Sequence, residues 1–470
     1  MYHRTNNHIV LSLAGYLASL AISWISLVDV GGLQVTPAQV AFLLLFCVFA
    51  WRNLPEFWTH TGSKVAIWFA GLYVLYLLAM FVAAFTAQAG DRQFALLAKY
   101  SVYFCMFLTL FMIFRCPSMQ NQMVAKSVYL GTAAGIAAFI GFSMFVFFRL
   151  GRNFLSEFFL AIIGGDSESL RFRIFLTLLN FSTDEINKTS DSFVAISRIN
   201  TLTGAFVLYL QLIWMYRRAA MDAFSRPVAS AILWGVTIFS ALMIIGSTSR
   251  TNLAAMLIAA SVAMLARLVS MSGGLLRDNF FVVSLIMVSI ASLGAIVAAP
   301  FFGIDDMLMA RFDIEGFMSN PRVEQYVDAW RGIQKRPISG YGLGAGVDIA
   351  GDNGRVGQQV HNLFLASWYE AGLAGFATSV IFYGYSVIIW LSEFSRVAAV
   401  SNDNRVPKVS LYWALGLPCL PLLRAMFAGQ GGNFTMMEWC CLAIFFAATV
   451  RNHDLGSDRQ MYLEFEHDSE

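Results

Sequence analysis

The sequence predicts an all-α, polytopic membrane protein with about twelve transmembrane helices and one large external loop. Hydrophobic residues make up 58% of the chain and charged residues only 13%, whereas soluble proteins carry about 25% charged residues. Apolar runs recur at roughly the 20 residues that a membrane-spanning helix needs. The alternating pattern of a membrane β-barrel is absent. Helices are therefore expected, because each satisfies its backbone hydrogen bonds within its own segment.

Charged loops and loops with glycine or proline separate the apolar runs. The predicted spans are residues 9–28, 37–51, 65–85, 94–114, 123–148, 199–216, 228–246, 252–269, 280–299, 373–391, 409–427 and 436–450. The chain then divides into four parts. Residues 1–299 contain nine spans and an outer loop at about 149–198, and residues 300–372 form a long loop. The last three spans lie at 373–450, and a tail follows at 451–470.

Lysine and arginine are distributed unevenly between alternate loops, although the net charge is only +2. With the N-terminus inside, the inner loops carry Arg52, Lys64, Arg115, Lys126, Arg217, Arg218, Arg226, Arg267, Arg277, Arg396, Arg405 and Lys408. The short outer loops carry single arginines near Arg92, Arg250 and Arg424. Because positive residues favour the cytoplasmic side, both termini are expected in the cytoplasm and both long loops outside.

The first long loop contains the apolar stretch GRNFLSEFFLAII at 151–163. Its apolar residues fall mostly on one helical face. This pattern fits a helix lying along the membrane surface, and it fits a short packing helix equally well.

The second long loop contains a helix that begins at Pro321, after the N-cap residue Asn320 and with Glu324 in its first turn. One face is apolar at helical spacing, with Val323, Tyr326, Val327, Trp330 and Ile333. Pro337 ends the helix. The glycine-rich sequence ISGYGLGAG follows, and its alternating glycines preclude a regular helix and allow close backbone approach.

Arg250 is the clearest candidate for a binding residue, since it lies in a short turn between two apolar runs. An arginine near the membrane is costly and usually faces a cavity or a polar substrate, although it also fits a side chain that snorkels to the headgroups. Arg198 is a second cation at an outer boundary, where an interfacial anchor is the simpler interpretation. Arg322 and Arg331 by themselves resemble an ordinary solvated face of the loop helix.

His361 is the candidate proton acceptor, because the other histidines fall in the tails or at the predicted inner face. It precedes Asn362 at the start of a helix, where the helix dipole disfavours the imidazolium. A neutral imidazole can accept a proton near pH 7, but a lone histidine is more often structural. No paired-carboxylate cluster suggests a metal site or another cofactor. Since arginine binds phosphate oxygens bidentately, these residues together suit a diphosphate leaving group without a metal.

Two motifs carry a family resemblance. The run R-x3-Y-x3-W-x6-P-I-S-G-Y-G-L-G starts at Arg322, and H-N-L-F-L-x4-E-A-G-L-A-G starts at His361. Together with the S-x-S-R turn that ends at Arg250, they resemble the superfamily of O-antigen ligases and Wzy-type polysaccharide polymerases. The resemblance covers about 55 residues, and elsewhere the likeness is one of hydropathy alone.

The resemblance implies a GT-C-like membrane glycosyltransferase of the bacterial inner membrane, acting in lipopolysaccharide or exopolysaccharide biosynthesis. Such enzymes take glycan from an undecaprenyl-diphosphate carrier and join it to an acceptor hydroxyl at the periplasmic face, in an inverting reaction without a metal or other cofactor. The loop 300–372 would then be periplasmic and carry the active-site helices. The family's catalytic residues map to His361 and Arg250, and its substrate-binding residues to Arg198, Arg322 and Asn362.

The implied partners are the carrier-linked donor, a glycan or lipid A–core acceptor, the lipid bilayer and other polysaccharide-assembly proteins, and no nucleic acid. Ligase and polymerase both fit these motifs, and the long first loop favours an acceptor other than lipid A–core. A transporter or flippase of lipid-linked oligosaccharide also suits a twelve-span chain, but transporters carry polar residues at mid-membrane and repeat symmetry. Here the predicted spans are nearly free of charge, except at Lys99. If the protein were a structural membrane subunit, His361 and the arginines would have no functional role.

Overall fold

The computed structural model describes residues 2–23, 25, 27–30, 33–60, 64–86, 92–115, 121–163, 174, 177–178, 192–246, 249–271, 321–345, 360–399, 408–427 and 436–448. Its helices are α1 (Tyr2–Leu20), α2 (Pro37–His60), α3 (Lys64–Thr86), α4 (Arg92–Arg115), α5 (Asn121–Arg149), α6 (Phe154–Ile163), α9 (Ser192–Met215), α10 (Arg217–Ala223), α11 (Arg226–Gly246), α12 (Arg250–Met271), α17 (Pro321–Lys335), α18 (Leu363–Ala399), α19 (Lys408–Gly416) and α20 (Cys419–Phe427). A further apolar helix spans Met436–Ala448. Two short strands, β1 (Val28–Val30) and β2 (Leu33–Val35), pair antiparallel.

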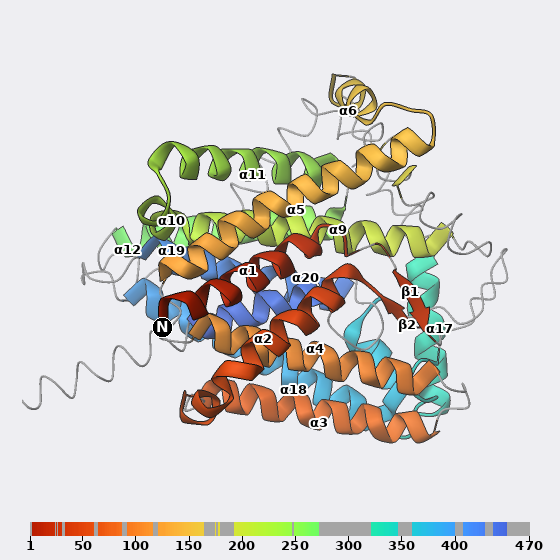
Figure 1. Cartoon of the computed structure of the whole chain (residues 1–470). Helices are drawn as coiled ribbons and strands as arrows, with labels where there is room; N and C mark the ends of the chain where they lie inside the picture. The colour runs from red at the N-terminus through yellow and green to blue at the C-terminus, as the bar shows by residue number, and fades with distance from the viewer. Residues whose placement is uncertain are drawn as a thin grey trace, which may run out of the picture.

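The long helices run side by side and form one bundle (Figure 1). The β1–β2 hairpin and α17 lie at one end of this bundle, and α17 runs across the direction of the long helices. The N-terminus and α10 lie at the opposite end. We call the end of the bundle that carries the hairpin and α17 the α17 end.

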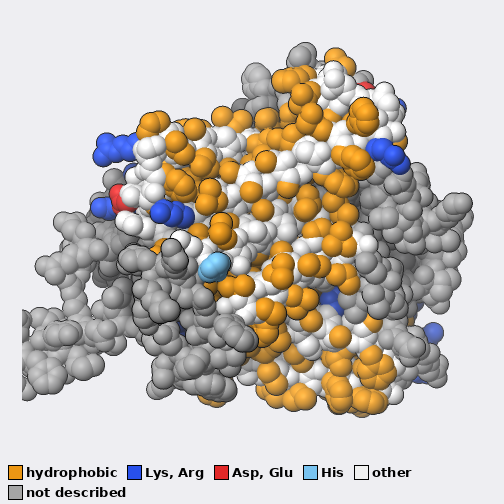
Figure 2. Space-filling model, in the orientation of Figure 1, with side chains coloured by type: hydrophobic (Ala, Val, Ile, Leu, Met, Phe, Trp, Pro, Cys, Tyr) orange, Lys and Arg blue, Asp and Glu red, His pale blue; other side chains and the backbone are white. Residues whose placement is uncertain are grey.

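Within the described residues, five helices are long and apolar enough to cross a membrane, and shorter apolar helices accompany them. The five are Val65–Phe85, Gln93–Arg115, Gln122–Arg149, Arg226–Ile245 and Leu363–Arg396. Hydrophobic side chains cover most of the described face in Figure 2, and lysine and arginine lie mainly toward its ends. Such a surface suits lipid rather than water. The chain is therefore an all-α, polytopic membrane protein, as the sequence predicted.

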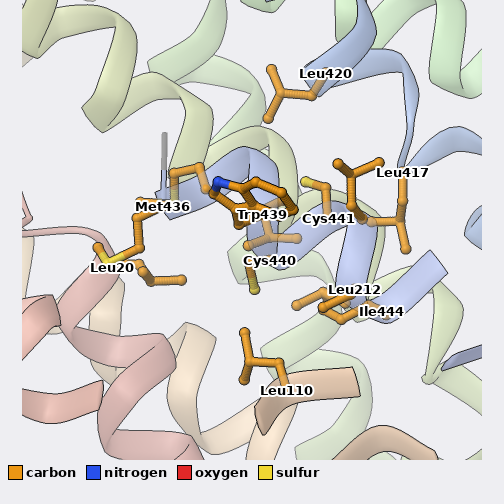
Figure 3. Close-up of a cluster of buried hydrophobic side chains, with 14 of the residues drawn as sticks. Leu20, Leu110, Leu212, Leu417, Leu420, Met436, Trp439, Cys440, Cys441 and Ile444 are labelled. Carbon is orange, nitrogen blue, oxygen red and sulfur yellow. The ribbon is translucent and has the colours of Figure 1, made fainter. Parts of the chain in front are cut away.

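The helix Met436–Ala448 forms the core of the bundle, since its side chains are buried from Met436 to Ala447. A helix that is hydrophobic all round is expected in such a position. Trp439, near the start of this helix, is fully buried and packs against the rings of Tyr73 at 4.5 Å and Phe107 at 5.5 Å. Figure 3 shows leucines from α1, α4, α9 and α20 around the same helix.

The predicted spans agree with the structure to within a few residues for α3, α4, α5, α11 and α12, whereas α9 begins seven residues before the predicted start at residue 199. The first span was predicted as residues 9–28, but α1 runs from Tyr2 to Leu20 and a turn follows at 21–23. The predicted span 409–427 is two helices, α19 and α20, which separate around Pro418, whose ring interrupts a helix. The predicted span 280–299 lies outside the described residues, as does most of the loop beyond 163.

The stretch in the first long loop does form a helix, α6. Phe154 at its start is buried and packs against Phe147 of α5, with ring centroids 5.5 Å apart. Leu155, Phe159 and Leu160 remain exposed on its other side. The helix thus packs on the bundle and also presents an apolar face outward.

Candidate functional site

The glycine-rich segment after α17, residues 337–345, folds as a series of turns, and we call it the strap. Gly340, Gly342 and Gly344 all have positive φ, at 64°, 99° and 79°, a region that side-chain-bearing residues rarely adopt. The N–H of Leu343 donates to the carbonyl of Ala83, near the end of α3, at 3.3 Å. The predicted role of these glycines in close backbone approach is therefore confirmed.

The strap binds to a break in α18. Gly372 has φ 64° and ψ −155° within the helix, which interrupts its hydrogen-bond ladder. The freed carbonyls of Tyr369 and Glu370 accept hydrogen bonds from the N–H groups of Tyr341 and Gly342, each at 2.8 Å. These bonds satisfy groups that would otherwise be buried without partners.

Aromatic side chains hold α17 against α18. Trp330 meets Trp368 edge to face at 5.8 Å, and the indole N–H of Trp368 donates to the carbonyl of Pro337 at 3.0 Å. Tyr341 stacks on Tyr369 at 4.7 Å, and the guanidinium of Arg336 lies 4.9 Å from the Tyr341 ring. The strap and α17 thus form one unit on the first part of α18.

His361 lies at the start of α18 and is only 8% exposed. Its carbonyl accepts a hydrogen bond from the hydroxyl of Tyr326 on α17 at 3.2 Å. The next residue, Asn362, caps α18, because its Oδ1 accepts from the N–H groups of Phe364 and Leu365, both at 3.0 Å. Its Nδ2 donates to the carbonyl of Met426, near the end of α20, at 3.1 Å.

His361 is therefore held from two sides, by α17 through Tyr326 and by α20 through Asn362. The amide of Asn362 is largely occupied by these backbone contacts. The predicted helix start at His361–Asn362 is confirmed, with Asn362 as the capping residue.

Arg250 is the first residue of α12, and Arg198 lies in the second turn of α9. The amide of Asn252 donates to the hydroxyl of Thr203, which joins these two helices close to both arginines along the chain. Arg322 is the second residue of α17, one turn before Tyr326. All three arginines therefore lie in the first or second turn of a helix. The Tyr326 hydrogen bond connects the start of α17 to His361.

Arg424 is not a loop residue, contrary to the charge pattern that placed it in a short outer loop. It lies within α20 and is fully buried. Its Nε is 3.0 Å from Oε1 of Glu438, on the central helix. The prediction of nearly uncharged spans was therefore wrong here, because the two charges compensate each other inside the bundle.

Glu370 of α18 is a second buried carboxyl group that sequence reasoning missed. It is 2% exposed and interacts electrostatically with Tyr76 and Tyr100. Tyr76 also shares a 3.3 Å hydrogen bond with Ser367. A charged residue inside an apolar run was the available signal for both Glu370 and Arg424. In the described part of the chain, no group of three histidine, cysteine, aspartate or glutamate residues could hold a metal ion.

Comparison with known families identifies part of the chain. Residues 235–380 match the family model for O-antigen ligase. The match confirms the resemblance seen in the motifs and defines what we call the O-antigen ligase region. It runs from α11 through the first half of α18, and so it includes Arg250, Arg322, His361 and Asn362.

Arg198 and the pair Arg424–Glu438 lie outside the O-antigen ligase region. Searches of curated proteins and of solved structures found no match. The chain is a multi-pass membrane protein in which this region contains the strap, α17 and the His361 turn.

Proposed function

We propose that this protein is a glycosyltransferase that transfers or polymerises glycan units from an undecaprenyl-diphosphate-linked donor. The acceptor is a hydroxyl group of a glycan or of lipid A–core at the periplasmic face of the bacterial inner membrane. The observation that carries this proposal is the match of residues 235–380 to the O-antigen ligase family. The match includes the buried His361 and its attachment to α17.

In the proposed reaction, Arg250 and Arg198 bind the diphosphate, because guanidinium groups pair with phosphate oxygens and remain charged. Arg322 binds the carrier phosphate or the sugar. The acceptor oxygen attacks the anomeric carbon from the face opposite the diphosphate, and the bond from that carbon to the phosphate oxygen breaks. His361 accepts the proton of the acceptor hydroxyl. The products are an inverted glycosidic bond and undecaprenyl diphosphate.

This chemistry needs no metal ion, since the arginines balance the charge of the leaving group. The proposal includes a GT-C-like arrangement of about twelve spans, with both termini in the cytoplasm. The α17 end would then face the periplasm, and residues 300–372 would form the periplasmic loop.

The first experiment is a gel profile of surface and carrier-linked glycans in a deletion strain. The strain is complemented with the wild-type protein, with His361→Ala, or with His8→Ala as a matched control. His8 lies exposed on α1, outside the O-antigen ligase region. We expect wild type and His8→Ala to restore the glycan, and His361→Ala to fail.

The deletion strain also separates the two reactions. Long chains left on the carrier with bare acceptor at the surface would identify a ligase, and single repeat units without long chains would identify a polymerase. A glycan profile unchanged by the deletion would contradict the proposal and favour a transporter instead.

A further inference from the structure

The buried ion pair between Arg424 and Glu438 is the feature that the proposed reaction leaves unexplained. Arg424 is fully buried and Glu438 is 2% exposed. Nε of Arg424 lies 3.0 Å from Oε1 of Glu438. All three guanidinium nitrogens are buried, and none forms a hydrogen bond with any residue that the structure describes.

Stability alone does not account for this pair. Burying two charges costs solvation energy that is recovered only when the geometry is excellent and the remaining donors are satisfied. Here the guanidinium is paired with Glu438 by charge, but none of its N–H groups forms a hydrogen bond with a described residue. Apolar residues of similar volume often replace such pairs without loss of stability. A charged pair inside a membrane bundle is therefore better explained by a function.

The position of the Arg424–Glu438 pair indicates what this function is. Gly204 of α9 leaves space for the guanidinium, because a Cβ at this residue would lie 3.2 Å from Nη1 of Arg424. Arg424 is thus held between α9 and the central helix. Two residues further along α20, the carbonyl of Met426 accepts the hydrogen bond from Asn362.

Asn362 then transmits this position to the start of α18. Its Oδ1 caps the helix, and its Nδ2 is bonded to α20. A shift or rotation of the end of α20 would move the Met426 carbonyl and with it the turn that carries His361. The Arg424–Glu438 pair holds α20 two residues before Met426, where, among the described residues, α20 is hydrogen-bonded to the His361–Asn362 turn.

We propose that the Arg424–Glu438 ion pair is a positioning element for His361, acting through the end of α20 and the side chain of Asn362. The proposal rests on the glycosyltransferase function proposed above. Arg424 and Glu438 are positioning residues in this scheme and do not touch the donor. Loss of the pair should therefore slow the transfer step and leave donor binding intact.

The test uses the full chain in membrane vesicles, with carrier-linked glycan and membrane acceptor extracted from the deletion strain. Release of undecaprenyl diphosphate is measured as the donor concentration varies. The pair is replaced by apolar residues in the double variant Arg424→Met, Glu438→Leu. The control is Arg396→Met, Glu393→Leu, which removes an ion pair of 2.6 Å in the last turns of α18.

We expect the maximal rate of the Arg424–Glu438 double variant to fall by about 10- to 100-fold, because a displacement of about 1 Å at a reacting group costs this much. The apparent KM for the donor should stay within about twofold, since uniform binding is unaffected. The control should keep the wild-type rate. A wild-type rate in the Arg424–Glu438 variant would overturn the proposal, and so would a raised KM with an unchanged maximal rate, which would make Arg424 a donor-binding residue.

A double-mutant cycle covers the case in which the apolar variant fails to fold. Arg424→Lys keeps the charge and changes the geometry of the pair. If the pair acts through Asn362, Arg424→Lys should reduce the rate about tenfold in the wild-type background and less than about twofold beside Asn362→Ala, because residues in one network are not additive. Additive effects would overturn the proposal.

Wild type and His361→Ala are assayed in parallel. No carrier release by wild type would count against the glycosyltransferase function itself. Release by wild type, none by His361→Ala and full release by the Arg424 variants would refute only the positioning role.

Discussion

The N–H of Gly342 donates a hydrogen bond of 2.8 Å to the carbonyl of Glu370, at the point where α18 is interrupted. The strap and the interruption of α18 at Gly372 therefore stabilise each other. Ile338 and Gly372 approach so closely that a Cβ on Gly372 would lie 1.9 Å from the carbonyl oxygen of Ile338. The sequence positions that permit this contact, Gly340 and Gly372, belong to the two motifs that resemble O-antigen ligases.

Gly372→Ala should displace the strap. Alanine is strained at a φ of 64°, and its methyl group overlaps the Ile338 carbonyl. We expect the free energy of unfolding to fall by at least about 2 kcal/mol and glycan transfer to be lost. Gly384→Ala in the same helix is the matched control, because nothing lies within 4 Å of its Cβ position. Thermal unfolding in detergent and the glycan profile measure both effects, and equal behaviour of the two variants would contradict the docking role of the strap.

Arg250→Ala should abolish transfer while the protein remains folded in the membrane. The variant removes a cation proposed to stabilise the leaving diphosphate, and the rate should fall by about 100-fold or more. Arg331→Ala is the control, since the Arg331 side chain is 69% exposed on α17 and pairs only with Asp328 among the described residues. Release of undecaprenyl diphosphate by purified protein is the measurement. Wild-type activity in Arg250→Ala would remove this residue from the proposed site.

Asn362 offers a pair of variants that separates its two contacts. Asn362→Ala removes the cap of α18 and the bond to Met426, and it should cost about 1 kcal/mol of stability as well as activity. Asn362→Asp keeps oxygen acceptors for the cap but loses the donor to the Met426 carbonyl. We therefore expect the aspartate variant to retain thermal stability and still transfer glycan slowly. If Asn362→Asp transfers glycan at the wild-type rate, the tie to α20 does not support catalysis.

Exhaustive chelation should leave transfer at its full rate, because the proposed leaving group is stabilised by arginine. The assay compares carrier release by membrane vesicles with and without EDTA, and then with Mg²⁺ restored. A strict requirement for Mg²⁺ would refute the metal-free mechanism.

Hydropathy predicted most of the helices because the cost of burying charge and backbone in lipid is a local property of the sequence. It extended the first span to residue 28, although α1 ends at Leu20, and it gave no structure to the link before the second span; the glycine pair Gly31–Gly32 was the available signal for a hairpin there. The split between α19 and α20 was likewise signalled by Pro418 within an apolar run.

The arrangement of the site was less predictable, because it depends on pairs far apart in the chain. Motifs located His361, the start of α17 and the glycines of the strap. They could not show that the Tyr326 hydroxyl reaches the His361 carbonyl, or that Asn362 reaches Met426. Arg424 was misplaced for the same reason, since an arginine beside an apolar run is equally compatible with a loop until its partner Glu438 is known.

The buried helix Met436–Ala448 has a consequence for assembly in the membrane. It occupies the centre of the bundle, yet it follows every other described helix in the chain. During synthesis, the earlier helices must therefore enter the bilayer before Trp439 is present to pack against the ring of Tyr73. The described bundle closes only when this helix arrives between the others, so its assembly requires translation to pass residue 448. A ribosome stalled before residue 436 would leave an open bundle, which the quality-control proteases of the membrane could recognise by its exposed interior.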